Sequence, residues 1–417
     1  MNSGFSQLSS FSTYHMNILI YTQYFVPESN APANRWGYFA RYLVRQGHQV
    51  TVLTSFPHHP QGKIFPGYKN KWRQTEEKDG IKIIRSWTYI SSSRKFLPRL
   101  LNYLSFAFSS YRNSASLKNL DLIIVSSPPL FVALQGKRIA QRKKIPLILD
   151  LRDIWPEAAV STGYLRRGLI YRWADRKAKG VYRTAQKILV NSPAMLEELE
   201  KEGVSREKLV FLPNGADLDL FSSRADSSVI NQQYHLEGKF VVLYTGLLGF
   251  AQAPEIMIKA ADLLKDTSDI VLLIVGIGPL YQSLKPKSDN VILVGAKPHK
   301  EIPNFIARAD LCLIPYKNKE TFKKNIPSKM YEYMAGGKAI IINLEGAAGK
   351  IIREAKAGLI VEPENPQALA EGILKLYQSQ ALRKEMEENS RSYGKEHGDR
   401  RIISQKLENI LQDVIKK

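Results

Sequence analysis

The sequence predicts an α/β protein made of two doubly wound parallel sheets, one in each half of the chain. Three observations predict this fold class. Apolar runs alternate with amphipathic stretches of helical period along almost the whole chain. The runs are apolar on both faces, as strands buried in a parallel sheet are. The length of 417 residues exceeds what one hydrophobic core usually holds, so two domains of roughly 200 residues each are expected.

In the first half, six apolar runs are predicted strands, because β-branched and aliphatic residues dominate them and turn residues bound them. The helix after the first run is expected to end at Gly47, since glycine accepts the left-handed conformation that closes a helix. The six predicted strands are residues 17–22, 49–54, 81–86, 121–126, 146–151 and 187–192.

Residues 222–233 (SSRADSSVINQQ) are polar and show no period, so they are predicted to link the two domains. Strands and helices then alternate again, and a charged helical stretch follows from about residue 380. The predicted strands of this half are residues 239–245, 270–276, 290–295, 310–315 and 338–344. We therefore expect one domain over residues 16–222, a second over 223–390, and a helical tail, 391–417, that packs back on the first.

Residues 326–335 (IPSKMYEYMA) predict a short helix with a ligand-binding end. Pro327 and Ser328 are typical of a helix start, where the serine hydroxyl can cap free amides, and Gly336 is typical of a helix end. Glu332 is the one carboxylate in this apolar and aromatic stretch. A carboxylate behind a helix N-terminus suits a nucleotide, with phosphates at the amides and ribose hydroxyls on the acid. The alternative is an exposed glutamate on a surface helix.

The composition excludes several classes of protein. The single cysteine, Cys312, lies in an apolar run and is expected in the core, so neither a disulfide framework nor a cysteine zinc site is indicated. No run reaches the roughly 18 apolar residues that a membrane helix needs. Residues 1–15 lack the basic start and apolar centre of a signal peptide. We expect a disordered extension there, or a true start at Met16.

The formal charge of +21 is concentrated in the first half, where residues 1–220 hold 32 Lys and Arg against 16 Asp and Glu. Residues 63–112 carry eleven basic and three acidic residues, interleaved with aromatic ones. Residues 94–112 resemble an apolar helix flanked by arginines, an element with which peripheral proteins bind anionic membranes. The alternatives are a helix that only packs on the first sheet, and nucleic acid, for which no binding motif is present.

Six segments, taken in order, resemble those of one enzyme family: residues 24–35 (YFVPESNAPANR), 47–64, 149–158 (LDLRDIWPEA), 212–221 (LPNGADLDLF), 293–303 and 327–338. Together they resemble family 4 glycosyltransferases, which are retaining enzymes of the GT-B fold with two Rossmann-like domains facing each other across a cleft. The resemblance covers nearly everything from Met16 onward. It is strongest to a bacterial surface-polysaccharide branch of fucosaminyltransferase type.

The resemblance implies a donor site in the second domain. Glu332 matches the second glutamate of the family's E-x7-E signature, which binds the nucleotide ribose, and Ala296 and Lys297 match the loop that holds the nucleobase through backbone groups. Gly276 begins a glycine turn that a simple strand-end turn would also explain. The donor-site residues implied in addition are Gly246, Gln252, Ser328 and Lys329.

The first domain is expected to hold the acceptor and the reacting centre. Arg152 and Asp153 directly follow a predicted strand, where α/β proteins place reactive groups. Arg152 falls near the position where many relatives have a histidine beside the reacting sugar, while a buried hydrogen-bonding role is the alternative for Asp153. The residues expected to line the acceptor side of the cleft are Asn30, Ala31, His59, Trp155 and Glu157.

The chain departs from the family pattern at the donor site. Lys324 stands where the signature has its first glutamate, which touches the donor sugar, and Leu247 and Gln252 replace an arginine and a lysine that bind the diphosphate. A departing diphosphate needs positive charge. We expect Lys324, assigned to the catalytic centre, or Lys329 to supply it. The alternative is a donor site that has decayed.

The resemblance predicts a retaining, hexosyltransferase-type enzyme without cofactor or metal. Its expected partners are a nucleotide-diphosphate sugar with UDP as nucleotide, a polyprenyl diphosphate-linked glycan acceptor and an anionic membrane surface, and no nucleic acid. The expected location is cytoplasmic, peripheral on the inner face of the cell membrane. Asp217 and Asp219 have the spacing of a metal-binding DxD, but a turn explains them. The competing hypothesis is a non-catalytic scaffold of a polysaccharide assembly complex.

Overall fold

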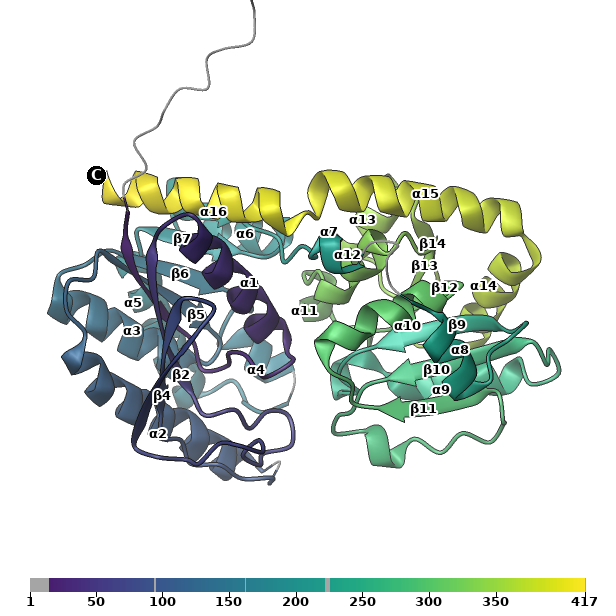
Figure 1. The fold of residues 1–417 in the computed structure, drawn as a ribbon, viewed down its shortest axis with the longest axis horizontal. Helices are drawn as coiled ribbons and strands as arrows, with labels where there is room; N and C mark the ends of the chain where they lie inside the picture. The colour runs from purple at the N-terminus through teal and green to yellow at the C-terminus, as the bar shows by residue number, and fades with distance from the viewer. Residues whose placement is uncertain (1–14, 94, 162, 222–225, 417) are drawn as a thin grey trace, which may run out of the picture.

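The computed structural model describes residues 15–93, 95–161, 163–221 and 226–416, so the extension predicted for residues 1–15 lies almost wholly outside the described residues. The chain folds into two α/β domains, each with a mainly parallel sheet between two layers of helices (Figure 1). This arrangement confirms the predicted fold class.

The strands of the first sheet lie in the order β3-β4-β2-β1-β5-β6-β7-β8, and all are parallel except β3, which pairs antiparallel with β4 at the edge. The sequence predictions miss β3 and β8. β3 is polar and mostly exposed, so it contains no apolar run, and β8 has only three residues. The strands are β1 (Asn17–Tyr21), β2 (Gln49–Ser55), β3 (Arg73–Lys78), β4 (Ile81–Ser86), β5 (Leu122–Ser127), β6 (Leu147–Leu151), β7 (Lys187–Val190) and β8 (Leu209–Phe211).

Two hydrophobic cores cover the faces of this sheet. Leu19 and Tyr21 of β1 point into one core, and Ile18 and Ile20 point into the other, as the period of two in a strand requires. The helices of the first core are α2 (Phe96–Asn113), α3 (Leu130–Lys143), α5 (Leu169–Thr184) and α6 (Pro193–Lys201). The second core contains α1 (Ala31–Arg45) and, from the far end of the chain, α16 (Arg400–Ile415).

The second sheet has the order β11-β10-β9-β12-β13-β14. Its strands are β9 (Phe240–Thr245), β10 (Ile270–Val275), β11 (Val291–Gly295), β12 (Leu311–Ile314), β13 (Ile340–Ile342) and β14 (Gly358–Ile360). One face is covered by α8 (Ser228–Tyr234), α10 (Ile302–Arg308), α12 (Ser328–Ala335) and α13 (Ala347–Glu354). The other is covered by α9 (Pro254–Leu263), α14 (Pro366–Gln378) and α15 (Gln380–His397).

Local differences from the predictions have simple causes. Residues 228–234, most of them in the predicted linker, form α8, whose only buried residue is Ile230, so its amphipathic period is weak. Pro327 takes the N-cap position of α12 and no side chain caps this helix, so the expected capping role of Ser328 is wrong. The short β14 contains three residues, too few to show a period.

The chain crosses between the domains twice, at places that lie side by side. Ala216 pairs with Asp399 in a short parallel bridge, next to the break between α15 and α16. Gly215 has a φ of +58°, and a Cβ there would lie 2.7 Å from the carbonyl oxygen of Gly398. In Figure 1, α15 runs along the second domain and α16 along the first. The C-terminal helices therefore join both domains.

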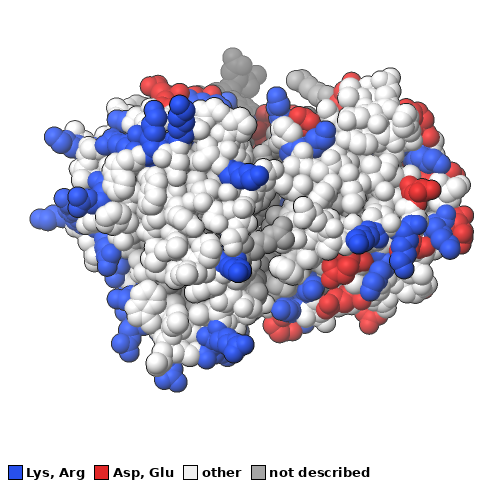
Figure 2. Space-filling view, turned by 90° about the horizontal axis from the view of Figure 1, so that it is seen from below, with Lys and Arg blue, Asp and Glu red and all other residues white. Residues whose placement is uncertain are grey.

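Exposed apolar side chains gather on two helices of the first domain. They are Phe96, Leu97, Leu101, Leu104 and Phe108 of α2 and Leu169, Ile170 and Trp173 of α5. Figure 2 shows, from below, a broad uncharged area on this domain bordered by Lys and Arg, whereas Asp and Glu gather on the second domain. Within the described ranges, no helix is long and apolar enough to cross a membrane.

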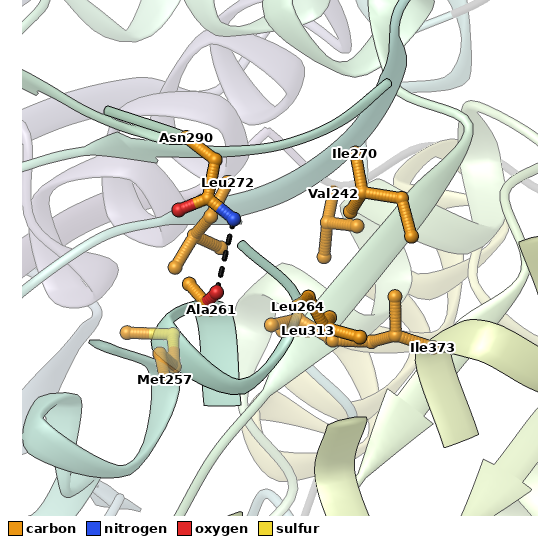
Figure 3. Close-up of a pocket in the computed structure, with 9 residues that line it drawn as sticks. All are labelled: Val242, Met257, Ala261, Leu264, Ile270, Leu272, Asn290, Leu313 and Ile373. Atoms are coloured by element: carbon orange, nitrogen blue, oxygen red, sulfur yellow. Dashed lines mark hydrogen bonds between the residues drawn. The ribbon is translucent and has the colours of Figure 1, made fainter. Parts of the chain in front are cut away.

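The cavity drawn in Figure 3 is a packing gap in the second domain. It measures about 10 Å³ and is lined by aliphatic side chains of β9, β10 and α9, with the amide of Asn290 turned to the carbonyl of Ala261 at 2.9 Å. A space of this size holds at most one water molecule. It is therefore no candidate for a ligand site.

Candidate active site between the two domains

Glu332 lies buried on α12 and has a partner that the sequence did not indicate. Its Oε1 atom is 3.0 Å from Nε2 of His299, in the loop after β11. Burial by itself would raise the pKa of Glu332, but the hydrogen bond and charge of His299, with Arg400 and Lys329 nearby, lower it. The carboxylate is therefore ionised and fixed in orientation, as an acceptor for two vicinal hydroxyls must be.

Lys329 lies one helical turn before Glu332 and is a partly exposed cation with no carboxylate in hydrogen-bond contact among the described residues. Its Nζ atom lies 3.7 Å from the centre of the Tyr244 ring, and a Cβ at Gly246 would lie 3.1 Å from it. Among the described residues, no carboxylate lies within 4.0 Å of this ammonium. Burial lowers the pKa of Lys329 to about 7, with Glu332 opposing the shift. An anion beside Gly246 would relieve this cost.

Two glycines bring the loops after β9 and β10 into backbone contact next to Lys329. Gly276 has a φ of +150°, and a Cβ there would lie 1.8 Å from the carbonyl oxygen of Gly246. Gly246 itself has a φ of +124°. Only glycine allows this approach and these dihedrals. The turn that the sequence analysis could explain as a simple strand end thus shapes the wall of the site around the ammonium.

Arg152 and Asp153 lie at the carboxyl end of β6, and Asp153 faces the second domain. The guanidinium of Arg152 is held by Ser126 Oγ at 3.2 Å and by the carbonyl oxygen of Pro128 at 2.9 Å. Asp153 accepts a hydrogen bond from Asn325 across the domain boundary. Burial raises the pKa of Asp153, and Arg152 and Asn325 offset this only in part.

Lys324 is engaged differently from Lys329. Its Nζ atom donates to Oε1 of Glu198, on α6 of the first domain, at 2.7 Å, and both side chains are partly exposed. Between the two lysines that the sequence offered for the diphosphate, the geometry favours Lys329, because the charge of Lys324 is already compensated. Lys324 instead connects the domains, beside a contact between α4 (Glu157–Ser161) and α11 (Glu320–Lys323) in which Lys319 Nζ donates to the carbonyl oxygen of Ser161.

Asn30 and His59 lie together on the acceptor side. Asn30 caps α1, its Oδ1 accepting from the amide of Ala33 at 3.0 Å, and its Nδ2 lies 3.5 Å from Nδ1 of His59. The His59 ring packs against the ring of Tyr24, with centres 5.1 Å apart. Burial lowers the pKa of His59 to about 4, so the ring is neutral at physiological pH. Glu28 fixes the loop by accepting from the amides of His58 and His59, each at 2.8 Å.

The remaining predicted site residues lie around this centre. Ala31 is the first residue of α1, and Gln252 bonds through its side chain to Tyr316. Trp155 is half-buried and packs on the first core. Glu157 accepts from Tyr171 at 2.5 Å and Arg167 at 3.1 Å on or beside α5, so its carboxylate is engaged there. Three further predicted residues lie in or beside the loops after β11 and before α12: Ala296, Lys297 and Ser328.

Sequence reasoning missed several residues of the site: Tyr24, His299, Tyr316, Asn325 and Arg400. Tyr316 follows β12, so the rule that places ligands at carboxyl ends of strands could have found it. His299 lies inside a quoted segment, but a lone histidine carries no spacing signal. Arg400 starts α16, almost seventy residues from Glu332, and only the fold places it near the site.

Two family models match this chain. The model described as "Glycosyl transferase 4-like domain" matches residues 30–215, and the one described as "Glycosyl transferases group 1" matches residues 226–393. The first range coincides with the domain that holds Arg152 and the second with the domain that holds Glu332. Between them they leave out only residues 1–29, 216–225 and 394–417.

The chain is also similar to individual proteins. It is 26% identical over 374 residues to WcaI of Escherichia coli (strain K12), a glycosyl transferase named for colanic acid biosynthesis. The alignment covers 86% of this chain and 91% of WcaI. The fold resembles Anabaena HepE crystallised with UDP and glucose, with a TM-score of 0.71 at 19% identity over 95% of this chain and 100% of that one. It also resembles sucrose-phosphate synthase from Thermosynechococcus elongatus, with a TM-score of 0.75 at 17% sequence identity. This match covers 96% of this chain and 100% of that one.

Proposed function

The chain belongs to the GT-B glycosyltransferases, and from this we propose that it moves a sugar from a nucleotide-diphosphate donor, a UDP-sugar, to a lipid-linked glycan acceptor in surface polysaccharide biosynthesis. The name of the E. coli relative supports the polysaccharide context. The UDP and glucose in the HepE crystal support the nucleotide. The fucosaminyltransferase-like specificity and the hexosyl class of the donor remain predictions.

A single observation carries the proposal: an ammonium without an ion-pair contact and an ionised carboxylate lie one helical turn apart on α12. Lys329 suits the diphosphate, since its position beside Gly246 leaves the positive charge without a counter-ion. Glu332, oriented by His299, suits the ribose hydroxyls. In this assignment Lys329 replaces the arginine and lysine that the family places at Leu247 and Gln252.

The proposed reaction is metal-independent and retains the configuration at the anomeric carbon. The bond from that carbon to the diphosphate oxygen breaks, and the acceptor oxygen bonds on the same face while its proton passes to the departing phosphate oxygen. Arg152 and Asp153 face this centre from the first domain. Lys329 stabilises the charge that develops on the diphosphate, and closure of the two domains excludes water.

The proposed site of action is the inner face of the cell membrane, bound peripherally. The exposed aliphatic and aromatic side chains of α2 and α5, with the surrounding Lys and Arg, support this. Co-flotation with vesicles of phosphatidylglycerol, lost at high salt, is the expected result. Absence of binding to such vesicles at low salt would contradict it.

Calorimetric titration with UDP, GDP, ADP and CMP tests the donor assignment. The protein is expected to bind UDP in the micromolar range, and Glu332→Gln and Lys329→Met are each expected to weaken binding about tenfold or more, the size of a lost charge-assisted contact. Lys265→Met, an exposed lysine after α9, is the matched control and should leave binding unchanged. No binding of any nucleotide would favour the non-catalytic scaffold instead, which the loss of the family's usual cations also suggests.

A further inference from the structure

A second cation without an acidic partner lies at the outer end of the acceptor side, on the first turn of α2. Arg99 donates through Nε to the hydroxyl of Tyr103 at 2.7 Å, and its guanidinium carbon lies 4.4 Å from the centre of the Tyr164 ring. Tyr103 is on the next turn of α2, and Tyr164 precedes α5. The guanidinium is therefore held by two aromatic residues from two different elements.

The free edge of this guanidinium faces no acid. In the part of the chain that the structure describes, no carboxylate lies within 4.0 Å of Arg99, and its two terminal nitrogens donate to no described group. The carboxylate of Glu28, which like Arg99 acts on the hydroxyl of Tyr24, already accepts from two backbone amides. A planar fork of donors, fixed by stacking and by one hydrogen bond, matches the oxygens of a phosphate.

The position of Arg99 connects this fork to the reacting centre. The hydroxyl of Tyr24 lies within electrostatic range of both Arg99 and Arg152. The ring of Tyr24 also packs on His59, which contacts Asn30 at the start of α1. The path from Arg152 outward therefore passes an aromatic surface of the kind that sugar rings pack against, and then reaches Arg99.

Beyond Arg99 the surface becomes apolar. Phe96, Leu97 and Leu101 are exposed on the same turns of α2, and Leu169, 83% exposed, follows Tyr164 on the adjoining segment. The order along the first domain is the polar and aromatic group of Asn30, His59 and Tyr24, then the cation of Arg99, then an aliphatic surface. An amphiphile with a phosphate between its glycan and its hydrocarbon has the same order of groups.

We propose that Arg99, positioned by Tyr103 and Tyr164, binds the diphosphate that joins the acceptor glycan to its lipid. This inference rests on the proposed function, since it assigns the anionic part of the same acceptor. It makes Arg99 the residue that selects lipid-diphosphate acceptors over free sugars and sets the distance between the membrane surface and the reacting centre.

The test uses the full chain and two soluble probes, farnesyl diphosphate and farnesol, in fluorescence or calorimetric titrations. Wild-type protein is expected to bind the diphosphate at least tenfold more tightly than the alcohol, and Arg99→Gln should remove most of that difference. Arg112→Gln, an exposed arginine on the last turn of the same helix, is the matched control. Arg99→Lys, which keeps the charge without the planar fork, should lie between the two.

Each other outcome has a definite meaning. If Arg99→Gln weakens binding to phosphatidylglycerol vesicles but not to farnesyl diphosphate, Arg99 contacts membrane headgroups and the proposal is wrong. If it weakens UDP binding equally, Arg99 has a general structural role and the proposal is also wrong. Tyr164→Leu, which removes the stacked ring alone, should reproduce a weaker form of the Arg99→Gln effect. Arg99-dependent binding in a protein that binds no nucleotide would refute only the donor assignment.

Discussion

Lys329 and Glu332 are the two residues of α12 to which we assign the diphosphate and the ribose of the proposed donor. Glu332 is buried and Lys329 is partly exposed, and their environments differ. Glu332 is satisfied by His299, whereas Lys329 has only the face of Tyr244 and the backbone of Gly246 beside it. An unpaired buried charge is costly and neutralises readily. The unfavourable free energy of such a charge is expected to be offset when an anionic ligand binds beside it.

The first prediction concerns the pH dependence of UDP binding. Burial lowers the pKa of Lys329 to about 7 in the free protein, so above pH 7 the ammonium must regain a proton before it can bind a diphosphate. The affinity for UDP should fall as pH rises from 7 to 8.5, by up to tenfold per unit. Calorimetry with Lys329→Arg, which stays protonated, is the control for ionisation of the nucleotide itself and should show a flatter profile.

The stability of the ligand-free protein should change in the opposite direction. The folded-state pKa of Lys329 lies below its ordinary value of 10.5, so the unfolded chain binds more protons between pH 7 and 10.5. The cost of the buried charge is fully present below pH 7 and decreases as pH rises through this window. Relative to Lys329→Met, the wild type should gain stability over that range in denaturant titrations. Identical profiles for the two proteins would refute the lowered pKa.

At the scale of elements, the site depends on two loops at strand ends whose backbones lie too close together for any residue with a Cβ atom. The loops after β9 and β10 touch through Gly246 and Gly276, and their contact sets the space around Lys329. Parallel strands bring such loops to one edge of a sheet, so the site follows from the order of strands. Helix α12, which carries Lys329 and Glu332, packs against α15.

The second prediction is that Gly276→Ala damages this edge. A Cβ at 1.8 Å from the Gly246 carbonyl forces the two loops apart, and the φ of +150° is strained for alanine, so we expect a loss of roughly 1–3 kcal/mol in the free energy of unfolding and weaker UDP binding. Gly203→Ala, where φ is +87° but no atom lies within 4 Å of the added Cβ, separates strain from collision. Equal effects of both variants on UDP affinity would contradict the argument.

At the scale of the whole molecule, the two domains are joined by two adjacent chain crossings and by polar contacts across the cleft. α16 leaves the second domain and completes a core of the first, while Arg400 at its start donates to the carbonyl oxygen of Asn214 at 3.0 Å and lies near Glu332. A hinge between the domains would therefore involve both crossings. Motion of one domain relative to the other must pass through these few residues.

The third prediction separates two roles for Lys324. If it only holds the domains together through Glu198, then Lys324→Ala and Glu198→Ala should change activity and solution dimensions alike, and the double variant should add little. The pair is partly exposed, so its coupling energy should not exceed about 1 kcal/mol. Small-angle scattering and kcat/KM measure both effects. A much larger loss in Lys324→Ala than in Glu198→Ala would restore the direct catalytic role expected from the sequence.

The sequence predicted the secondary-structure elements more completely than the residues of the candidate site. The central strands, such as β1 and β10, were predicted to within about a residue, because their buried faces leave continuous apolar runs. The edge strand β3 and the short β14 were not predicted, because neither contains a run of buried apolar residues. At the site, Glu332 could be proposed from local pattern and Lys329 from the family resemblance. His299 and Asn325 could not be proposed, because their roles arise from contacts with distant segments.

By itself, the sequence determined the α/β class, the two-domain division, the resemblance to a glycosyltransferase family and the choice of two lysines for the diphosphate. The first two follow from local periodicity. The resemblance follows from short segments of the chain, and the choice of the two lysines follows from the resemblance. The tertiary structure decided which lysine lacks an ion-pair contact, which histidine orients Glu332, and that Arg400 at the start of the last helix lies near Glu332. Charge compensation and burial depend on neighbours in space, and those neighbours lie up to hundreds of residues apart along the chain.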